Sequence, residues 1–490
     1  MSGRLGLQNE DPNMNLQSDT SKDNPASPRR TRPTTGYALS LVITGDAIDA
    51  AQISAAVAEL GAEVRSTAPI SGGLEAFVAC SGVQQQQQVL DVLGGLSGVD
   101  SVCSSDTTFD LHVGGKIVVS PRTAIQGPDE LAMAYTPGVG RVSTQIAEEP
   151  SSVWRFTGRS NAVAVLSNGT AVLGLGDIGP EAAMPVMEGK AVLFKQFGGV
   201  DAYPVCVNAP TVDEVVAVGA AIAPTFGGIN LEDIKAPECF EIEERLQEML
   251  DIPIFHDDQH GTAIVVVAAL LNAAKVIGRP LSELTVTIVG TGAAGVACAH
   301  LLAEVGVGDI IGVDSQGILD SSRAGLHPSK QWFVDHGNKR NLSGGAREAI
   351  EGADVLIGLS GPGVIEPEWV SKMSDDAIVF ALANPVPEIM PELMPENVAV
   401  VATGRSDYPN QINNVLAFPG VFRGLLDVRA TNASMGVKRA AAEALAAMVV
   451  EPTVERVIPG AFEEGVAETV ARSVAEQARK EGLARELVAD

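Results

Sequence analysis

A glycine-rich turn between a strand pattern and a helix pattern constrains the fold of this chain most. The β-branched run Val286–Val289 leads directly into Gly-Thr-Gly-Ala-Ala-Gly, which opens an apolar helical pattern. In this context glycines permit a tight turn and let a pyrophosphate approach the helix N-terminus. The pattern therefore predicts a Rossmann-type dinucleotide-binding unit. The candidate contacts are the residues of the turn: Gly290, Thr291, Gly292, Ala293, Ala294 and Gly295.

The acid at the end of the next predicted strand bears on which dinucleotide is bound. Asp314 follows Gly290 by 24 residues, where a carboxylate can accept hydrogen bonds from the adenosine ribose. Ser315 and Gln316 come next, rather than Arg or Lys. Because an acid repels a 2′-phosphate, NAD is favoured as the cofactor and NADP is the alternative.

Alternating strand and helix patterns surround this turn. They predict an α/β doubly wound parallel sheet over residues 266–430 and helices over 431–490. The predicted strands are Leu284–Val289, Asp309–Val313, Asp354–Gly358, Ala377–Ala381 and Val398–Ala402. Residues 111–265 mix helix and strand signals and form a separate predicted domain.

The N-terminal part of the chain shows two further kinds of sequence pattern. Residues 1–35 are rich in Asn, Asp, Ser, Pro and Arg, which predicts a disordered tail. Residues 36–110 show the order βαββαβ, which predicts a ferredoxin-like module. By pattern and position this module resembles an ACT domain, a small regulatory unit that usually binds amino acids. A small-molecule effector is therefore expected there.

Charge and cysteine usage limit the partners. The chain has 33 basic and 61 acidic residues, a net charge of −28, which repels nucleic acid and anionic membranes. It shows neither an apolar signal segment nor an uninterrupted apolar run of about 18 residues. Its five cysteines are widely spaced, as is typical of reduced thiols. We expect a cytoplasmic protein with no nucleic-acid or membrane partner, in which an anionic substrate meets local positive charge or a metal.

Two acidic pairs lie in otherwise apolar sequence and are candidate metal ligands. Glu232-Asp233 comes about 25 residues before Asp257-Asp258. Carboxylate oxygens suit Mg²⁺ or Mn²⁺, with positions left for substrate, so Glu232, Asp233 and Asp258 are the predicted ligands. The histidines beside the second pair do not fit a zinc-protease helix, because aspartate rather than glutamate follows the first of them.

Eight motifs occur in an order that is similar to bacterial-type malic enzymes, and the resemblance covers about residues 111–450. They are Tyr-Thr-Pro-Gly-Val (135–139), Gly-Asp-Ile-Gly-Pro (176–180), Met-Glu-Gly-Lys (187–190), Asn-Leu-Glu-Asp-Ile (230–234), Phe-His-Asp-Asp-Gln-His-Gly-Thr-Ala (255–263), the glycine-rich turn (290–295), Leu-Ala-Asn-Pro (382–385) and Asn-Asn-Val-Leu-Ala-Phe-Pro-Gly (413–420). The resemblance implies oxidative decarboxylation of (S)-malate to pyruvate and CO₂, with NAD(P) and a divalent metal. The predicted architecture is thus a malic-enzyme catalytic domain followed by the Rossmann-type domain.

The resemblance also implies roles for single residues. Tyr135 matches the family's general acid, and Lys190, at the entry to a predicted apolar strand, matches its general base. The two acidic pairs match its metal ligands, with Asp257 more suited to orienting the base than to binding metal. The remaining matches contact substrate carboxylates or nicotinamide: Asn384, Asn413 and Asn414.

Alternatives remain at this point. A metal-assisted NAD-dependent 2-hydroxy acid dehydrogenase that does not decarboxylate would use the same residues. A ligand sensor with a dead catalytic part is disfavoured because Tyr135, Lys190 and the acids are all intact. Lys190 acts as a base only if its pKa falls from about 10.4. We expect a homo-oligomer, but the sequence leaves open its size, the effector, the NAD/NADP ratio and the direction of flux.

Overall fold

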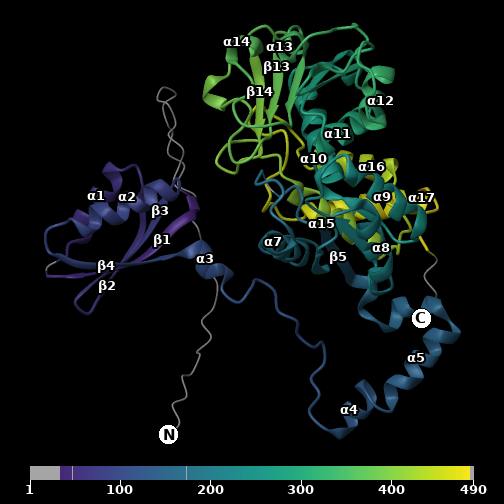
Figure 1. Cartoon of the computed structure of the whole chain (residues 1–490), viewed down its shortest axis with the longest axis horizontal. Helices are drawn as coiled ribbons and strands as arrows, with labels where there is room; N and C mark the ends of the chain where they lie inside the picture. The colour runs from purple at the N-terminus through teal and green to yellow at the C-terminus, as the bar shows by residue number, and fades with distance from the viewer. Residues whose placement is uncertain (1–33, 47, 173, 486–490) are drawn as a thin grey trace.

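The computed structural model describes residues 34–46, 48–172 and 174–485 (Figure 1). Most of the predicted tail lies outside these ranges, but residues 34–35 already belong to the first strand. The front module contains, in order, β1 (Thr34–Gly45), α1 (Ala50–Glu59), β2 (Glu63–Ile70), β3 (Gly73–Cys80), α2 (Val83–Gly94) and β4 (Val99–Asp106). Its antiparallel sheet has the order β2-β3-β1-β4. The predicted βαββαβ arrangement is confirmed.

The module has its own core and ends later than residue 110. Buried side chains of its strands meet those of the two helices, among them Leu41, Val57 and Leu93. The short helix α3 (Thr107–His112) returns to β1, because Thr107 Oγ1 donates to the carbonyl of Ala38 at 3.1 Å. The module therefore extends to the end of α3.

An arm of residues 113–149 connects the module to the rest of the chain. It contains an extended stretch, α4 (Pro128–Ala134) and α5 (Gly138–Glu148). In the structure α4 packs mainly on α5, and α5 on the following turn η1 (Pro150–Ser152). None of the residues in α4 or α5 is buried.

The next unit is built on a parallel sheet of order β6-β5-β7-β8. Two short turns, α6 (Val153–Phe156) and η2 (Gly158–Asn161), precede it. Its strands are β5 (Ala162–Ser167), β6 (Asp201–Cys206), β7 (Gly228–Leu231) and β8 (Ile254–His256), and its helices are α7 (Pro180–Gly198), α8 (Val212–Ile222) and α9 (Glu238–Met249), with η3 (Ala223–Thr225) after α8. All four strands point the same way, so residues that follow them gather at one edge.

The strand expected after Lys190 is wrong: the residue lies in the middle of helix α7. The apolar run there is one face of a helix, because its buried residues recur every three or four positions. They are Ala183, Met187, Ala191, Phe194 and Gly198. A short apolar run does not distinguish a buried strand from a buried helix.

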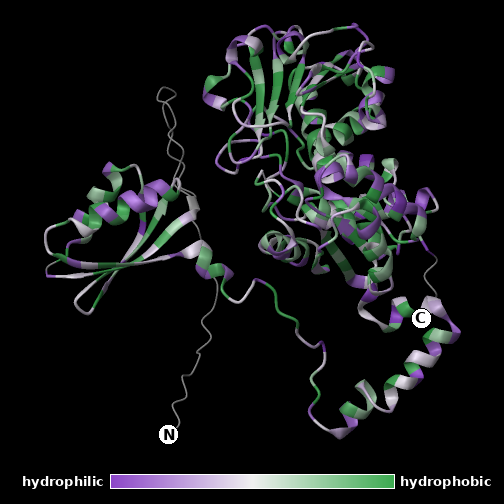
Figure 2. Cartoon of the chain, viewed as in Figure 1, coloured by the Kyte–Doolittle hydropathy of each residue, from purple (hydrophilic) through white to green (hydrophobic). Residues whose placement is uncertain are grey.

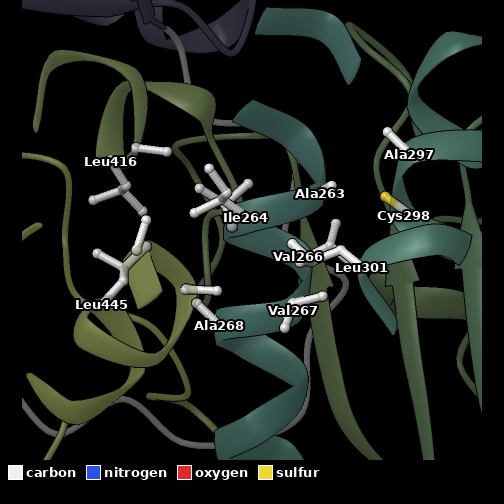
Figure 3. Close-up of a cluster of buried hydrophobic side chains, with 14 of the residues drawn as sticks. Ala263, Ile264, Val266, Val267, Ala268, Ala297, Cys298, Leu301, Leu416 and Leu445 are labelled. Atoms are coloured by element: carbon white, nitrogen blue, oxygen red, sulfur yellow. The ribbon is translucent and has the colours of Figure 1, made fainter. Parts of the chain in front are cut away.

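Helix α10 (Asp257–Val276) is the central element of the core. Figure 3 shows its apolar side chains between α11 (Ala293–Glu304) and the segment that carries Leu416 and Leu445. By length and composition α10 could cross a membrane, but most of it is buried inside the protein, as a core helix is. The predicted domain boundary at residue 265 falls inside this continuous helix.

The third sheet has the order β11-β10-β9-β12-β13-β14, parallel except for the short β11. Its strands are β9 (Thr285–Val289), β10 (Asp309–Asp314), β11 (Gly317–Ile318), β12 (Val355–Gly358), β13 (Ala377–Ala381) and β14 (Val398–Thr403). The short helix η4 (Leu281–Glu283) precedes β9. Further short helices lie between the later strands: α12 (Pro328–His336), α13 (Ala346–Ile350), α14 (Pro367–Val370) and η5 (Pro391–Leu393). The doubly wound sheet is confirmed.

Helices complete the chain after the third sheet. They are η6 (Asn414–Leu416), α15 (Phe418–Asp427), α16 (Met435–Ala447) and α17 (Val466–Lys480). α15 packs against α17 and also against α7, so the C-terminal helices cover the unit that contains Lys190. α16 packs on α10.

Candidate active site

Two neighbouring strand ends bring the acidic pairs together. Glu232 and Asp233 follow β7, and Asp257 and Asp258 follow β8, which pairs with β7 in parallel. One oxygen each of Glu232, Asp233 and Asp258 lies within 4.8 Å of the others. The Asp233 backbone N–H donates to Asp258 Oδ2 at 2.9 Å and ties the two loops together. The predicted ligand set therefore converges.

Lys190 reaches this cluster from α7. Its Nζ lies 2.8 Å from Glu232 Oε1, 2.6 Å from Asp257 Oδ2 and 4.2 Å from the centre of the Phe418 ring. Burial alone lowers the pKa of Lys190, but Asp257 and Glu232 raise it more, so the net shift is upward. The structure thus presents Lys190 as an ammonium, and the lowered pKa that a base needs requires these carboxylate charges to be offset.

Asp257 is fully buried and faces Lys190. Its Oδ2 also accepts a hydrogen bond from Asn414 Nδ2 at 3.1 Å, and Asn414 Oδ1 accepts one from Thr262 at 3.1 Å. A Cβ at Gly261 would lie 1.9 Å from Asp257 Oδ1, so this position requires glycine. The arrangement fits an acid that orients the lysine rather than one that binds metal.

The residues present fit a divalent cation. Four carboxylates face one ammonium group, which leaves three negative charges in a largely buried space if all are ionised. Burial raises the pKa of Glu232 well above its usual range; Lys190 opposes this, and Asp258, Asp257 and Asp233 add to it. A hard cation would offset that charge, and three carboxylate ligands suit Mg²⁺ or Mn²⁺.

The glycine-rich turn lines a cleft of about 1090 Å³. Gly290 has φ +108° and a Cβ there would lie 2.2 Å from the Leu359 carbonyl oxygen. Gly292 precedes α11, whose first residues are Ala293 and Ala294. Thr291 also lines the cleft. The turn therefore presents a helix N-terminus to the cleft, as a pyrophosphate site requires.

Gly295 has a packing role in this turn. A Cβ there would lie 2.0 Å from the Gly290 carbonyl oxygen and 3.4 Å from Ile288. The glycine therefore lets α11 approach β9 closely.

Asp314 lies on the same cleft but has two basic partners that sequence reasoning missed. Arg323 donates to its two oxygens at 3.1 and 3.0 Å, and Lys330 donates at 2.8 Å. Burial raises the pKa of Asp314, but the hydrogen bonds from Arg323 and Lys330 lower it more, to about 2. Arg323 and Lys330 follow Asp314 by 9 and 16 residues, and only the folded chain shows that they contact it.

A buried polar network lies next to the acidic pair Asp257-Asp258, around Glu243. Glu243 of α9 accepts hydrogen bonds from the His256 backbone at 3.0 Å and from Gln259 at 3.2 Å, and bonds to His260 at 2.9 Å. Burial lowers the pKa of His260 to about 4 despite Glu243, so the ring is neutral near pH 7. Lys438 Nζ lies 3.1 Å from the same ring. Glu243 and Lys438 carried no sequence signal beyond an acid and a base in helical patterns.

Three of the predicted site residues do not contact the Lys190 cluster in the structure. Tyr135 is 69% exposed at the end of α4, in the arm that lies outside the body of the protein (Figure 1). Asn413 caps η6, accepting from the Val415 N–H at 3.0 Å. Asn384 is exposed in the loop after β13. Among the predicted asparagines, Asn414 is the one hydrogen-bonded to the Lys190 site.

Comparison with known proteins agrees with this arrangement. Residues 115–247 match the malic enzyme N-terminal domain family, and residues 259–479 match the malic enzyme NAD-binding domain family. The chain is 48% identical to the NAD-dependent malic enzyme of Geobacillus stearothermophilus, over 91% of this chain and 95% of the relative. It is 44% identical to the NADP-dependent malic enzyme of Halomonas elongata, over 77% of this chain and 94% of the relative.

A solved structure shows the same fold. The malic enzyme of Pyrococcus horikoshii superposes with a TM-score of 0.74 at 51% identity, over 76% of this chain and 89% of the other. Both domains that hold the candidate site are therefore matched in sequence and in structure. The chain belongs to the malic enzyme family.

Proposed function

We propose that this protein oxidises (S)-malate to pyruvate and CO₂ with NAD as the hydride acceptor and Mg²⁺ or Mn²⁺ as the metal. One observation carries the proposal: Lys190 lies between Glu232 and Asp257, beside three carboxylates of a metal-type set. The family and the NAD-binding domain support the same chemistry.

Different side chains of the protein have different roles in this proposed reaction. Glu232, Asp233 and Asp258 would hold the cation. When bound, the metal supplies positive charge that offsets the carboxylates and acts as a Lewis acid toward the oxygen on C2. Lys190 accepts the proton of the C2 hydroxyl as hydride leaves that carbon. Asp257 and Asn414 hold Lys190 in place.

Protonation of C3 after CO₂ leaves needs an acid, and we assign it to Tyr135. A tyrosine hydroxyl is one of the side-chain groups that can serve as a general acid. The exposed position of Tyr135 leads us to propose a homo-oligomer in which the arm of one copy reaches the Lys190 site of another.

Exposed apolar residues support this use of the arm. In addition to Tyr135 they are Val113, Val118, Val119, Ile125, Leu131, Met133, Val139 and Val142. In Figure 2 the ribbon of the arm includes hydrophobic stretches, drawn in green. Many exposed apolar side chains on one segment are typical of an interaction site. A second copy is the occupant that would also supply the missing acid.

The front module is proposed to regulate rather than catalyse, as an ACT-like unit that binds a small-molecule effector. Its separate core supports this, as does the location of every candidate catalytic and metal-binding residue after residue 130. A cytoplasmic location is proposed from the cysteines, all five of which are free.

Replacing Lys190 tests the proposal. Lys190→Met should slow NADH formation from malate by about 10²–10⁴-fold, because a single general base is typically worth that much. Lys195→Met is the matched control, because Lys195 lies on the same helix with an exposed side chain paired to Asp201. NADH binding should be intact in both variants. Malate oxidation at the wild-type rate by Lys190→Met would refute the assignment.

A further inference from the structure

The carboxylate of Asp314 has no free acceptor position in the structure. It accepts from Arg323 twice, from Lys330 and from the Gln316 backbone N–H at 2.9 Å. A carboxylate offers about four lone-pair positions, so these four bonds fill them. A ribose hydroxyl can reach Asp314 only if one of these donors gives way.

The three charged groups leave one excess positive charge at this end of the cleft. Arg323 and Lys330 both line the cleft, together with Ser329 and the glycine-rich turn. The Arg323 side chain is 18% exposed and is also held by Gln316 Oε1 at 3.2 Å. Asp314 ends β10, the strand next to β9, where the adenosine ribose lies in Rossmann-type units. Two cations therefore surround the expected position of a 2′-substituent.

We propose that Arg323 and Lys330 form a latent 2′-phosphate site, and that the charge of Asp314 is what keeps this site closed to NADP. The proposal rests on the dinucleotide use stated above and adds the residues that determine its specificity. It implies that removing one charge opens the site, with no need to introduce a new cation. Arginine with a lysine beside it suits phosphate, because charge-assisted hydrogen bonds to phosphate are strong.

Binding of cofactor fragments to the full-length protein tests this without catalysis. The probes are AMP and adenosine 2′,5′-bisphosphate, which differ only in the 2′-phosphate, and the readout is calorimetric affinity. Asp314→Asn keeps the side-chain shape and should tighten bisphosphate binding roughly 10- to 100-fold, as expected for new hydrogen bonds to a charged group. AMP binding should not tighten.

Second substitutions identify the donors. Arg323→Gln or Lys330→Gln, added to Asp314→Asn, should remove most of the gain for the bisphosphate and change the affinity for AMP much less. Lys372→Gln is the matched control, because Lys372 is exposed and lies outside the cleft lining. It should keep the full gain.

Two results would overturn the proposal: bisphosphate binding to Asp314→Asn no tighter than to wild type, or a gain that survives both the added Arg323→Gln and the added Lys330→Gln substitution. Absence of malate turnover in a protein that shows the expected fragment selectivity would instead refute the proposed function and leave this assignment in place.

Discussion

At the residue scale, sequence motifs predicted the chemical groups better than their partners. The two acidic pairs lie close together because each follows one of two neighbouring parallel strands. The order of the motifs along the chain already suggested this. Lys190 beside Asp257 was likewise expected from the resemblance. The contacts of Arg323 and Lys330 with Asp314 were not expected, since Arg323 lies in the loop after β11 and Lys330 on α12, and both reach Asp314 only in the folded chain. Contacts made by loops carry no periodic signal that a sequence pattern could reveal.

A prediction at this scale concerns Asp258, a proposed ligand without an ion pair to Lys190. Asp258→Asn should weaken Mn²⁺ activation at least about tenfold, because even partners outside the metal's own ligands are worth 10–100-fold. NAD affinity should not change. Titrating Mn²⁺ in the malate assay measures this, with Asp213→Asn as control because Asp213 is exposed on α8. An unchanged Mn²⁺ requirement would exclude Asp258 from the metal site.

At the scale of elements, boundaries were predicted where strong local signals occur. The strand predicted over Leu284–Val289 ends where the glycine-rich turn begins, and β9 ends at the same residue. The error at α7 has a physical reason, because Ala-Val-Leu-Phe suits the buried face of a helix as well as a strand. Packing of α7 against β6 and α15, which decides between a helix and a strand, is a long-range property.

The contact between α15 and α17 yields a stability prediction. A Cβ at Gly424 would lie 2.4 Å from the Ala471 carbonyl oxygen and 2.8 Å from Val474 Cβ. Gly424→Ala should therefore force the two helices apart and lower the free energy of unfolding by about 1–3 kcal/mol. Because α15 begins with Phe418, which packs on Lys190, malate turnover should fall as well.

Thermal unfolding followed by calorimetry measures the effect. Gly460→Ala is the control, because a Cβ there meets no atom within 4 Å. Equal Tm values for Gly424→Ala and wild type would show that the helices are less closely packed than the structure indicates.

At the scale of the whole molecule, the sequence predicted the domain order but not the location of the arm. All motifs of the resemblance are present in one chain, yet Tyr135 lies exposed at the end of α4. A motif residue can complete the active site of its own chain or that of another copy. The motif itself does not distinguish the two cases, because the difference arises from assembly. The exposed apolar side chains of the arm fit the shared site proposed above.

Mixing two inactive variants tests the shared site. Tyr135→Phe keeps a functional Lys190, and Lys190→Met keeps a functional Tyr135. If the arm acts on another copy, unfolding and refolding the two together should restore activity at about a quarter of the sites, as expected for random pairing into two-fold dimers. Each variant refolded alone is the control. No recovery in the mixture would place both groups in the site of one chain.

Removing the front module tests its role. A chain beginning at Val113, just after α3, should retain malate turnover because the catalytic cluster lies in later elements. It should lose any response that the full-length protein shows to amino acids, acyl-CoA or dicarboxylates. Assaying both chains with each compound measures this. An effector that acts equally on the two would bind elsewhere.

If one site both oxidises and decarboxylates malate, the C4 carboxylate leaves as CO₂ while NADH forms. Following C4 therefore distinguishes a malic enzyme from a simple dehydrogenase. Malate labelled with ¹³C at C4 is incubated with the full-length protein, Mn²⁺ and NAD, while NADH is followed by absorbance and the carbon products by NMR. We expect one labelled CO₂ and one unlabelled pyruvate for each NADH. NADH formed together with labelled oxaloacetate, and without enzyme-dependent release of labelled CO₂, would contradict this expectation and identify a dehydrogenase that does not decarboxylate.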